Sequence, residues 1–303
     1  MSEHTLEGQT IRGRGRLVDY SNLVKLPHTI FALPFAGVGA VLASYLPGVV
    51  VRVGDIFWIL LAFTSARFAA MAFNRISDRE IDAKNPRTRS REIPSGRLSV
   101  GEARVSVVLA GALFLLSAGM LNRFCLMLAP FALAWVLFYS YTKRFTRWAH
   151  LVLGGGLAIA PVGAYLALTG AWSEPAALLW VLAGAVLCWV AGFDILYSLQ
   201  DADFDRREGL HSVPAAFGVA GAIRISRALH LLAGTLFALV GVLAGTLGTL
   251  YFVGVAIIAA LLLYEQSLVK ADDLSKVDAA FFTLNGVISV VFFAIVLVER
   301  LLA

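Results

Sequence analysis

The segment Asn74-Arg75-Ile76-Ser77-Asp78-Arg79-Glu80-Ile81-Asp82 closes a long apolar run with a row of polar side chains. Asn74, Asp78 and Asp82 are spaced i, i+4, i+8. Each of these steps advances by only about 40° around an α-helix, so the three oxygen-bearing side chains share one face. Glu80 lies about 200° away from that face and is expected in solvent. We call residues 74–82 the first acidic segment.

A second acidic segment, residues 194–205, follows another long apolar run. Asp194, Asp201 and Asp205 form one predicted stripe in it, and Tyr197 lies on the same stripe. Asp203 is expected to point away from this stripe into solvent. Paired acidic rows of this kind suit divalent cations that are held against a phosphorylated ligand.

The composition indicates an all-α, polytopic membrane protein. Of the 303 residues, 59% are hydrophobic and 15% are charged, and the mean hydropathy is +0.80. Soluble domains carry about 25% charged residues. Because ionised carboxylates are costly in a bilayer, we interpret both acidic segments as functional. The net charge is +5, but the basic residues lie in loops between apolar runs, so nucleic acid is not expected as a partner.

The sequence predicts a bundle of about nine transmembrane helices in one domain, residues 22–303, after an N-terminal tail of residues 1–21. The candidate spans cover approximately residues 22–46, 56–82, 101–121, 124–142, 148–168, 176–200, 221–244, 248–269 and 278–300. Pro27 and Pro34 predict a kinked or broken first helix. The tail has no apolar core of the kind found in a signal peptide.

Lysine and arginine placement predicts the orientation of these spans in the lipid bilayer. If the N-terminus is cytoplasmic, the loops on the opposite side contain only Arg52 and Arg123, with Arg300 at the C-terminus. Both acidic segments then lie on the cytoplasmic face. We expect a multi-pass protein of a bacterial-type inner membrane, with its site on that face.

The expected chemistry is that of Mg²⁺, which prefers oxygen ligands and is usually shared between carboxylates and substrate phosphates. The candidate ligands are Asn74, Asp78, Asp82, Asp201 and Asp205. The neighbouring loops contain candidate diphosphate-binding residues, since arginine suits bidentate phosphate contacts and lysine acts as a point charge. These residues are Arg87, Arg91, Lys143 and Arg144. A diphosphate at the membrane surface with its hydrocarbon tail in the bilayer is a polyprenyl diphosphate.

Such a site favours transfer of the prenyl group. The metal assists departure of the diphosphate, and a dry chamber with aromatic side chains protects the allylic carbocation until an electron-rich ring attacks it. The candidate catalytic residues are Asp78, Asp201, Tyr139 and Tyr197. The candidate residues for contacting substrate are Asn22, Lys25, His28 and Asp194.

These residues resemble the UbiA superfamily of intramembrane aromatic prenyltransferases over nearly the whole chain. The first acidic segment resembles the family's NDxxDxxxD motif, and residues 201–205 match its DxxxD motif. Three further blocks resemble family segments, namely residues 139–144 (Y-x-x-x-K-R), 194–197 (D-x-x-Y) and 209–212 (G-x-x-S). The resemblance implies a nine-helix fold, Mg²⁺ dependence, and a role in the synthesis of quinones or related lipids.

Within that superfamily, residues 25–34 and 85–88 resemble the 4-hydroxybenzoate polyprenyltransferase branch, which implies an aromatic acid as the acceptor and ubiquinone synthesis. Residues 197–214 are similar to the MqnP type, which implies the futalosine route to menaquinone. One departure is Arg75, which replaces the first motif aspartate. It is expected either to contact phosphate or to extend to the lipid headgroups.

Two alternatives to this function stay open. The same fold could use another acceptor: a naphthoate, haem, a chlorophyllide or a glycerol phosphate lipid. A cation-coupled transporter is the second alternative, although its site would lie near the bilayer midplane rather than at one surface.

Two features within the spans are assigned to helix packing. Gly154, Gly155 and Gly156 are expected to permit close approach of helices, since no strand precedes them as in a phosphate-binding loop. Asn285 is expected to form an interhelical hydrogen bond.

Overall fold

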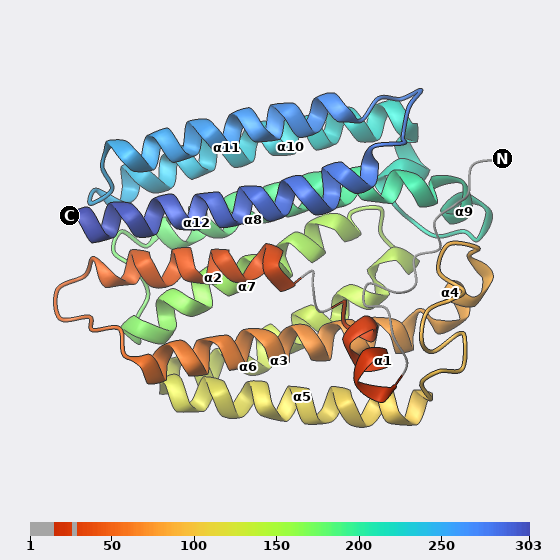
Figure 1. The fold of residues 1–303 in the computed structure, drawn as a ribbon, viewed down its shortest axis with the longest axis horizontal. Helices are drawn as coiled ribbons and strands as arrows, with labels where there is room; N and C mark the ends of the chain where they lie inside the picture. Colours follow the sequence, from red (N-terminus) through yellow and green to blue (C-terminus); the bar gives the residue numbers. More distant parts are fainter. Residues whose placement is uncertain (1–14, 26–28) are drawn as a thin grey trace.

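The computed structural model describes residues 15–25 and 29–303. Long helices run side by side along the longest axis, with short helices at one end (Figure 1). Helices and the loops between them make up the described chain, where the sole β-bridge is the isolated pair Lys270–Asp273. The predicted all-α bundle is therefore confirmed.

The N-terminal half contains seven α-helices and one 3₁₀-helix within the described residues. They are α1 (Arg16–Leu23), α2 (Thr29–Ser44), α3 (Val53–Ser77), α4 (Arg79–Lys84), α5 (Val100–Leu121), α6 (Arg123–Phe138), the 3₁₀-helix η2 (Tyr139–Arg144) and α7 (Ala149–Thr169).

The C-terminal half adds five α-helices, a 3₁₀-helix and a π-helix. They are α8 (Ala177–Ser198), the 3₁₀-helix η3 (Leu199–Asp201), α9 (Ala202–Arg207), α10 (Val213–Ala244), α11 (Thr249–Leu268), the π-helix η4 (Ala279–Leu284) and α12 (Asn285–Leu302). The φ of +69° at Gly218 breaks α10 near its start.

Eight helices in the described ranges are long and apolar enough to cross a membrane, and α2 is a ninth, shorter apolar helix. The predicted multi-pass architecture is thus confirmed, although the first span differs from the expectation of residues 22–46. Residues 16–23 form the separate helix α1, and α2 begins only at Thr29. Pro34 lies inside α2, whereas Pro27 is outside the described residues.

Local sequence signals fix several helix ends. Ser99 begins α5 with a capping box, in which its hydroxyl accepts from the Glu102 backbone N–H while the Glu102 carboxylate accepts from the Ser99 N–H. The side chain of Ser212 likewise caps α10. Gly170 ends α7 with a φ of +65°, a left-handed conformation that glycine adopts without strain.

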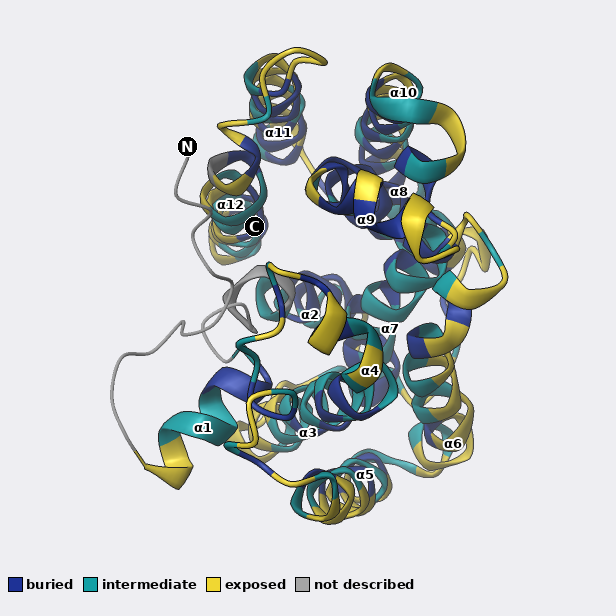
Figure 2. Cartoon of the chain, turned by 90° about the vertical axis from the view of Figure 1, so that its right-hand side faces the viewer, coloured by how far each residue is buried: buried dark blue, intermediate teal, exposed yellow. Residues whose placement is uncertain are grey.

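Helix α8 forms the centre of the bundle. It is mostly dark blue in Figure 2, between α7 and α10, and it packs extensively on both. Its Trp189 joins an aromatic core with Phe35, Phe237 and Phe292 from three other helices. Because α8 leads directly into the second acidic segment, this core fixes where that segment lies.

Glycines allow the helices around α8 to approach closely. A Cβ atom on Gly39 of α2 would lie 1.9 Å from the carbonyl oxygen of Pro161 on α7, so these two helices are in close contact at this glycine. A Cβ atom on Gly154 would lie 2.4 Å from the carbonyl oxygen of Leu187 on α8. The packing role predicted for Gly154 is confirmed.

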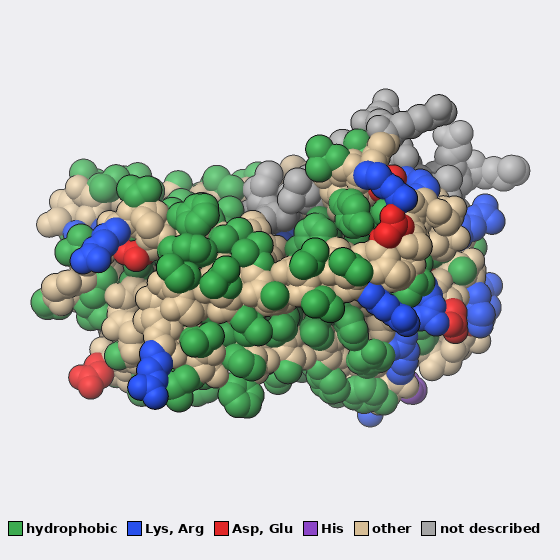
Figure 3. Space-filling model, turned by 90° about the horizontal axis from the view of Figure 1, so that it is seen from below, with side chains coloured by type: hydrophobic (Ala, Val, Ile, Leu, Met, Phe, Trp, Pro, Cys, Tyr) green, Lys and Arg blue, Asp and Glu red, His purple; other side chains and the backbone are tan. Residues whose placement is uncertain are grey.

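Charged side chains lie at the two ends of the bundle, and the flank between them is apolar. In Figure 3 most of them gather at the right-hand end, which is the end that carries α4 and α9 in Figure 1. The two acidic segments both reach this end, since α4 and α9 belong to them. We call it the polar end.

Replacement of Gly154 by alanine should destabilise the bundle by about 1–3 kcal/mol, because the new methyl group meets backbone of α8 that cannot move alone. Gly163→Ala on the same helix is the matched control, since a Cβ atom there meets nothing within 4 Å. Thermal unfolding in detergent should show a lower Tm for Gly154→Ala only. Equal Tm values for the two variants would contradict the close packing of α7 on α8.

Candidate active site

The first acidic segment keeps its predicted row although the helix is interrupted within it. Helix α3 ends at Ser77 and α4 begins at Arg79, with Asp78 at the junction. The backbone N–H of Asp78 still donates to the Asn74 carbonyl oxygen, at 2.9 Å, and the Asn74 amide donates to the Asp78 carboxylate, at 2.8 Å. Glu80 points to solvent as predicted, with its side chain 78% exposed.

The second acidic segment runs from α8 through η3 into α9. Asp201 lies at the end of η3 and Asp205 in α9, and both are buried. The side chain of Asp203 is 86% exposed, as predicted. The buried position of the other two aspartates follows from the attachment of this segment to the central helix α8.

The loop after α4 connects the two acidic segments. Arg87 forms a bidentate ion pair with Asp201, at 3.0 Å from Nε to Oδ1 and 2.5 Å from Nη2 to Oδ2. Its third nitrogen, Nη1, donates to the Tyr197 hydroxyl oxygen at 3.0 Å. The Asn85 amide also donates to Asp201, at 3.1 Å. Residues separated by more than 100 positions in the chain thereby form one cluster.

Each of the other three aspartates in this cluster is paired with one of the basic residues singled out in the sequence. The pairs are Arg91–Asp82 at 2.7 Å, Arg144–Asp78 at 3.2 Å and Lys143–Asp205 at 3.7 Å. Charge-assisted pairs of this kind compensate carboxylates that would otherwise be costly to bury. The structure thus brings the candidate metal ligands and the candidate diphosphate-binding residues into one site.

The electrostatics of the site are visible in two shifted pKa values. Burial of the carboxyl group and the neighbouring charge of Asp82 raise the pKa of Asp78 to about 6. Burial and the guanidinium groups of Arg91, Arg75 and Arg87 lower the pKa of Lys25 well below its usual value. The site therefore concentrates both signs of charge in a poorly hydrated space.

The donor set fits a hard divalent cation such as Mg²⁺. Oδ2 of Asp82 and Oδ2 of Asp205 are buried and accept no hydrogen bond in the described structure. Oδ2 of Asp205 has only the longer ion-pair contact of 3.7 Å with Nζ of Lys143, so one carboxylate oxygen from each acidic segment can still accept a ligand. Among the described residues, no three His, Cys, Asp or Glu side chains lie close enough together to form a metal site by themselves. The carboxylates are instead separated by their ion pairs with arginine and lysine. A cation here would complete its coordination with water or substrate oxygens, which is usual for Mg²⁺.

Helix α1 and the turn after it lie beside this cluster. Asn22 is buried on α1 and Lys25 follows its end, whereas His28 lies outside the described residues. Arg75 is buried, and its Nε donates to the Leu23 carbonyl oxygen at 3.4 Å. The alternative that Arg75 extends to the lipid headgroups is therefore wrong. A cation near a helix C-terminus is stabilised by the helix dipole, so Arg75 anchors α1.

Asp194 has a partner that the sequence did not reveal. Its Oδ2 lies 2.6 Å from Nδ1 of the buried His150 on α7. The Val213 backbone N–H donates to the other ring nitrogen, Nε2, at 3.4 Å. His150 thus joins α7, α8 and the start of α10. The sequence signal for this contact was the position of His150, a single histidine at the start of an otherwise apolar span.

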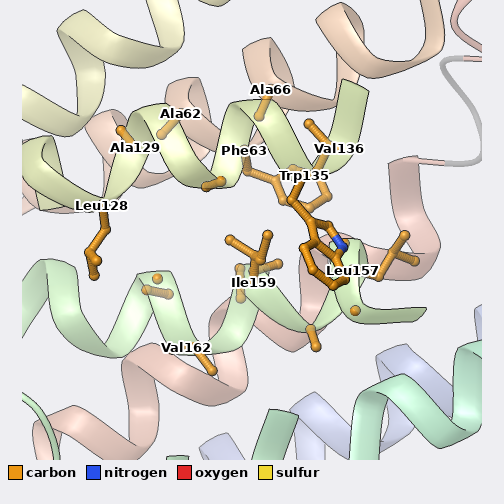
Figure 4. Close-up of a pocket in the computed structure, with 18 of the residues that line it drawn as sticks. Ala62, Phe63, Ala66, Leu128, Ala129, Trp135, Val136, Leu157, Ile159 and Val162 are labelled. Atoms are coloured by element: carbon orange, nitrogen blue, oxygen red, sulfur yellow. The ribbon is translucent and has the colours of Figure 1, made fainter. Parts of the chain in front are cut away.

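An apolar cavity of about 730 Å³ lies among α2, α3, α5, α6, α7 and α8. In Figure 4 the side chains of Leu128, Trp135 and Ile159 extend into the space between the helices. Asn74 and Tyr139 also line the cavity. Since Asn74 is the first residue of the first acidic segment, the cavity extends to that segment. The Asn74 amide also donates to Asp78, which carries the connection on to the aspartates.

Arg67 is a further residue of interest that sequence reasoning missed. It is the single charged side chain among the described residues that line the cavity. Its position seven residues before Asn74, about two helical turns, places it on the same side of α3. An arginine in the middle of an apolar span is a functional signal in its own right, because it is costly in a bilayer.

Comparisons with known proteins agree with this architecture. The model of the UbiA prenyltransferase family matches residues 32–287. The chain is 31% identical over 291 residues to a 4-hydroxybenzoate octaprenyltransferase of Nitrosospira multiformis, covering 93% of this chain and 96% of that protein. It is 32% identical over 241 residues to the protein of the same name from Citrobacter koseri, covering 78% and 81% of the two chains.

Solved structures show the same fold. A UbiA homologue from Aeropyrum pernix K1, in its apo form, superposes with a TM-score of 0.81 at 36% identity, covering 90% of this chain and 98% of that one. A UbiA homologue from Archaeoglobus fulgidus bound to GPP and Mg²⁺ gives a TM-score of 0.69 at 20% identity, covering 93% and 99%. The chain is accordingly a multi-pass membrane prenyltransferase, and it belongs to the UbiA prenyltransferase family.

Proposed function

We propose that this protein catalyses the Mg²⁺-dependent transfer of a polyprenyl chain from polyprenyl diphosphate to an aromatic acid of the 4-hydroxybenzoate type, in quinone synthesis. The observation that carries the proposal is a cluster of four aspartates and four basic residues next to an apolar cavity, which is lined by Asn74, the hydrogen-bond partner of Asp78. The charged cluster suits a metal diphosphate, and the cavity suits a hydrocarbon tail.

At the polar end, the two acidic segments would hold Mg²⁺ through Asn74, Asp78, Asp82, Asp201 and Asp205. When bound, the metal supplies Lewis-acid stabilisation of the departing diphosphate. The basic residues would bind the diphosphate oxygens directly, with Arg87 and Arg91 on one side and Lys143 and Arg144 on the other. Lys25, which lies close to Arg87 and Arg91, would add a further donor to the same group.

The reaction exchanges the allylic C–O bond of the prenyl diphosphate for a C–C bond to the aromatic ring. The leaving diphosphate takes the bonding electron pair and, overall, the ring proton. The apolar walls of the cavity exclude water from the allylic cation. Tyr139 lines this cavity, so its phenol ring would stabilise positive charge there, and Tyr197 would act beside Asp201, where its hydroxyl contacts Arg87.

Arg67 supports an acidic acceptor. A guanidinium group inside an apolar cavity is a favourable partner for a carboxylate, because charge-assisted hydrogen bonds strengthen at low dielectric. Asn22 and Asp194 are also proposed to contact substrate, as is His28, which lies outside the described residues. The similarity to 4-hydroxybenzoate octaprenyltransferases favours a hydroxybenzoate, and both the ubiquinone and the menaquinone route stay within the proposal.

We further propose a cytoplasmic polar end in a bacterial-type inner membrane. The loops at the opposite end contain few basic residues, Arg52 and Arg123, which follows the positive-inside rule. In this orientation residues 1–21 would lie on the cytoplasmic side, ahead of the transmembrane domain of residues 22–303, and α1 (Arg16–Leu23) crosses the boundary between the two.

The purified protein, given polyprenyl diphosphate, Mg²⁺ and 4-hydroxybenzoate, should release diphosphate and form a prenylated ring, detected by mass spectrometry. Asp78→Ala combined with Asp201→Ala should lower the rate at least about a hundredfold, since the metal contributes several kcal/mol. Asp203→Ala, on an exposed side chain of the same segment, is the matched control. Full activity of the double variant would rule out these aspartates as metal ligands. Prenylation of a naphthoate but not of 4-hydroxybenzoate by the wild-type protein would show that the acceptor is a different aromatic acid.

Arg87→Gln should raise KM for the prenyl diphosphate by about tenfold or more, because Arg87 offers a bidentate contact to phosphate. Lys84→Gln should change this KM by less than about twofold, since exposed pairs such as Lys84–Glu208 contribute little. Steady-state kinetics at saturating acceptor separate the two variants. Equal KM values for Arg87→Gln and Lys84→Gln would exclude Arg87 from the diphosphate site.

Arg67→Gln should raise KM for the aromatic acid by about tenfold to a hundredfold, the loss expected for one charge-assisted hydrogen bond of about 1.5–3 kcal/mol. KM for the prenyl diphosphate should change little. An acceptor of the same shape that lacks the carboxyl group is the control, since wild type and variant should use it equally well. A similar loss with both acceptors would show that Arg67 does not contact the carboxylate.

A further inference from the structure

A wall of aromatic rings packs against Tyr197. The ring of Phe281 stacks on Tyr197 with centroids 4.1 Å apart, and the ring of Phe282 meets it edge-on at 5.7 Å. Phe193, one turn earlier on α8, packs against Phe281 at 5.3 Å. Offset and edge-on aromatic contacts each restrict the orientation of a ring. The phenol of Tyr197 is therefore held by two residues that lie far away in sequence.

Both phenylalanines belong to the π-helix η4 (Ala279–Leu284), which precedes α12. A π-turn is wider than an α-turn and occurs frequently at functional sites. It places Phe281 and Phe282, which are adjacent in sequence, against the same tyrosine ring. The conformation of this turn therefore determines the positions of the Phe281 and Phe282 rings against Tyr197.

Asn285, the first residue of α12, holds the turn from within. Its Nδ2 donates to the carbonyl oxygens of Ala280 and Phe281, at 3.2 Å and 3.1 Å. Its side chain is fully buried. Backbone carbonyls within a bilayer need such partners, because water is absent there.

Asn285 is itself fixed by two other helices. Trp189 on α8 donates from Nε1 to the Asn285 Oδ1 at 2.8 Å, and Nδ2 of Asn285 lies 3.3 Å from Oε1 of the buried Glu265 on α11. The predicted interhelical hydrogen bond of Asn285 is thus confirmed. One amide group joins α8, α11 and the π-turn.

We propose that Asn285 is a positioning residue for diphosphate binding, which acts through the π-turn and Phe281 on Tyr197 and so on Arg87. The Tyr197 hydroxyl accepts a hydrogen bond from Nη1 of Arg87, the one nitrogen of that guanidinium outside the bidentate pair with Asp201. Displacement of the Tyr197 ring would therefore break the hydrogen bond between its hydroxyl and Nη1 of Arg87 and leave the guanidinium less well positioned. The proposal rests on the proposed function, in which Arg87 contacts the diphosphate.

The test measures binding of inorganic pyrophosphate in the presence of Mg²⁺ by calorimetry, on the full chain in detergent. Asn285→Leu preserves volume but removes the amide, and should weaken binding about tenfold, a coupling typical of residues in one network. Ser289→Ala, one turn further along α12, is the matched control, because the Ser289 hydroxyl donates only within its own helix, to Gly286. It should bind as wild type does.

A double-mutant cycle separates positioning from a general loss of stability. Tyr197→Phe keeps the ring but removes the hydroxyl that contacts Arg87, so Asn285→Leu should weaken binding by less than about twofold in that background. The same tenfold loss in both backgrounds would overturn the proposal. Phe281→Leu, which leaves the Asn285 amide intact, should weaken binding as Asn285→Leu does, and it provides the test if Asn285→Leu fails to fold.

Pyrophosphate binding does not involve the aromatic acceptor or the transfer step, so the two proposals fail separately. Absence of any prenylated product from the wild type would contradict the proposed function while the binding cycle still reports on Asn285. Conversely, normal pyrophosphate binding by both Asn285→Leu and Phe281→Leu, in a protein that prenylates its acceptor, would refute the positioning role alone.

Discussion

The constraint on which the site depends is that carboxylates at the end of an apolar helix bundle must be compensated by cations. Asp78, Asp82, Asp201 and Asp205 each have a basic partner from another part of the chain or from the adjoining loop. A buried carboxylate that loses such a partner is left as an uncompensated charge, at a cost of several kcal/mol. The loop after α4, the end of η2 and the segment formed by η3 and α9 are therefore held together by charge.

The apolar part of the bundle gives this cluster a fixed base. Helix α8 is buried between α7 and α10, and its last turns carry Tyr197 and lead into Asp201. Close approach at Gly154 brings α7 against α8, and His150 on α7 then reaches Asp194. The same packing leaves the cavity between α3, α6 and α7, so tail and diphosphate would meet at one place. Fold and site are thus coupled through a single central helix.

Periodicity predicted what is local and missed what depends on contacts between distant segments. The row of Asn74, Asp78 and Asp82 follows from helical spacing, and it survives the break at Asp78 because the i→i−4 hydrogen bonds continue. A kink or break in the first span was predicted from Pro27 and Pro34, but its position between α1 and α2 was not, since apolar content alone does not show where one helix ends and the next begins. Nor could spacing pair Arg87 with Asp201 or His150 with Asp194, which are 114 and 44 positions apart.

The pairing of aspartates with basic residues also explains why such a site would bind its ligands together. In the proposed reaction Arg87 and Arg91 bind the diphosphate instead of Asp201 and Asp82. These two carboxylates are then able to bind a cation. A cation alone would have to displace the arginines without giving them a new partner, and a diphosphate alone would leave the carboxylates exposed to one another. Each ligand therefore favours the other, and by linkage the two coupling free energies are equal. The ion pairs within the protein would thus be replaced by ion pairs of its basic residues with the diphosphate and of its carboxylates with the cation.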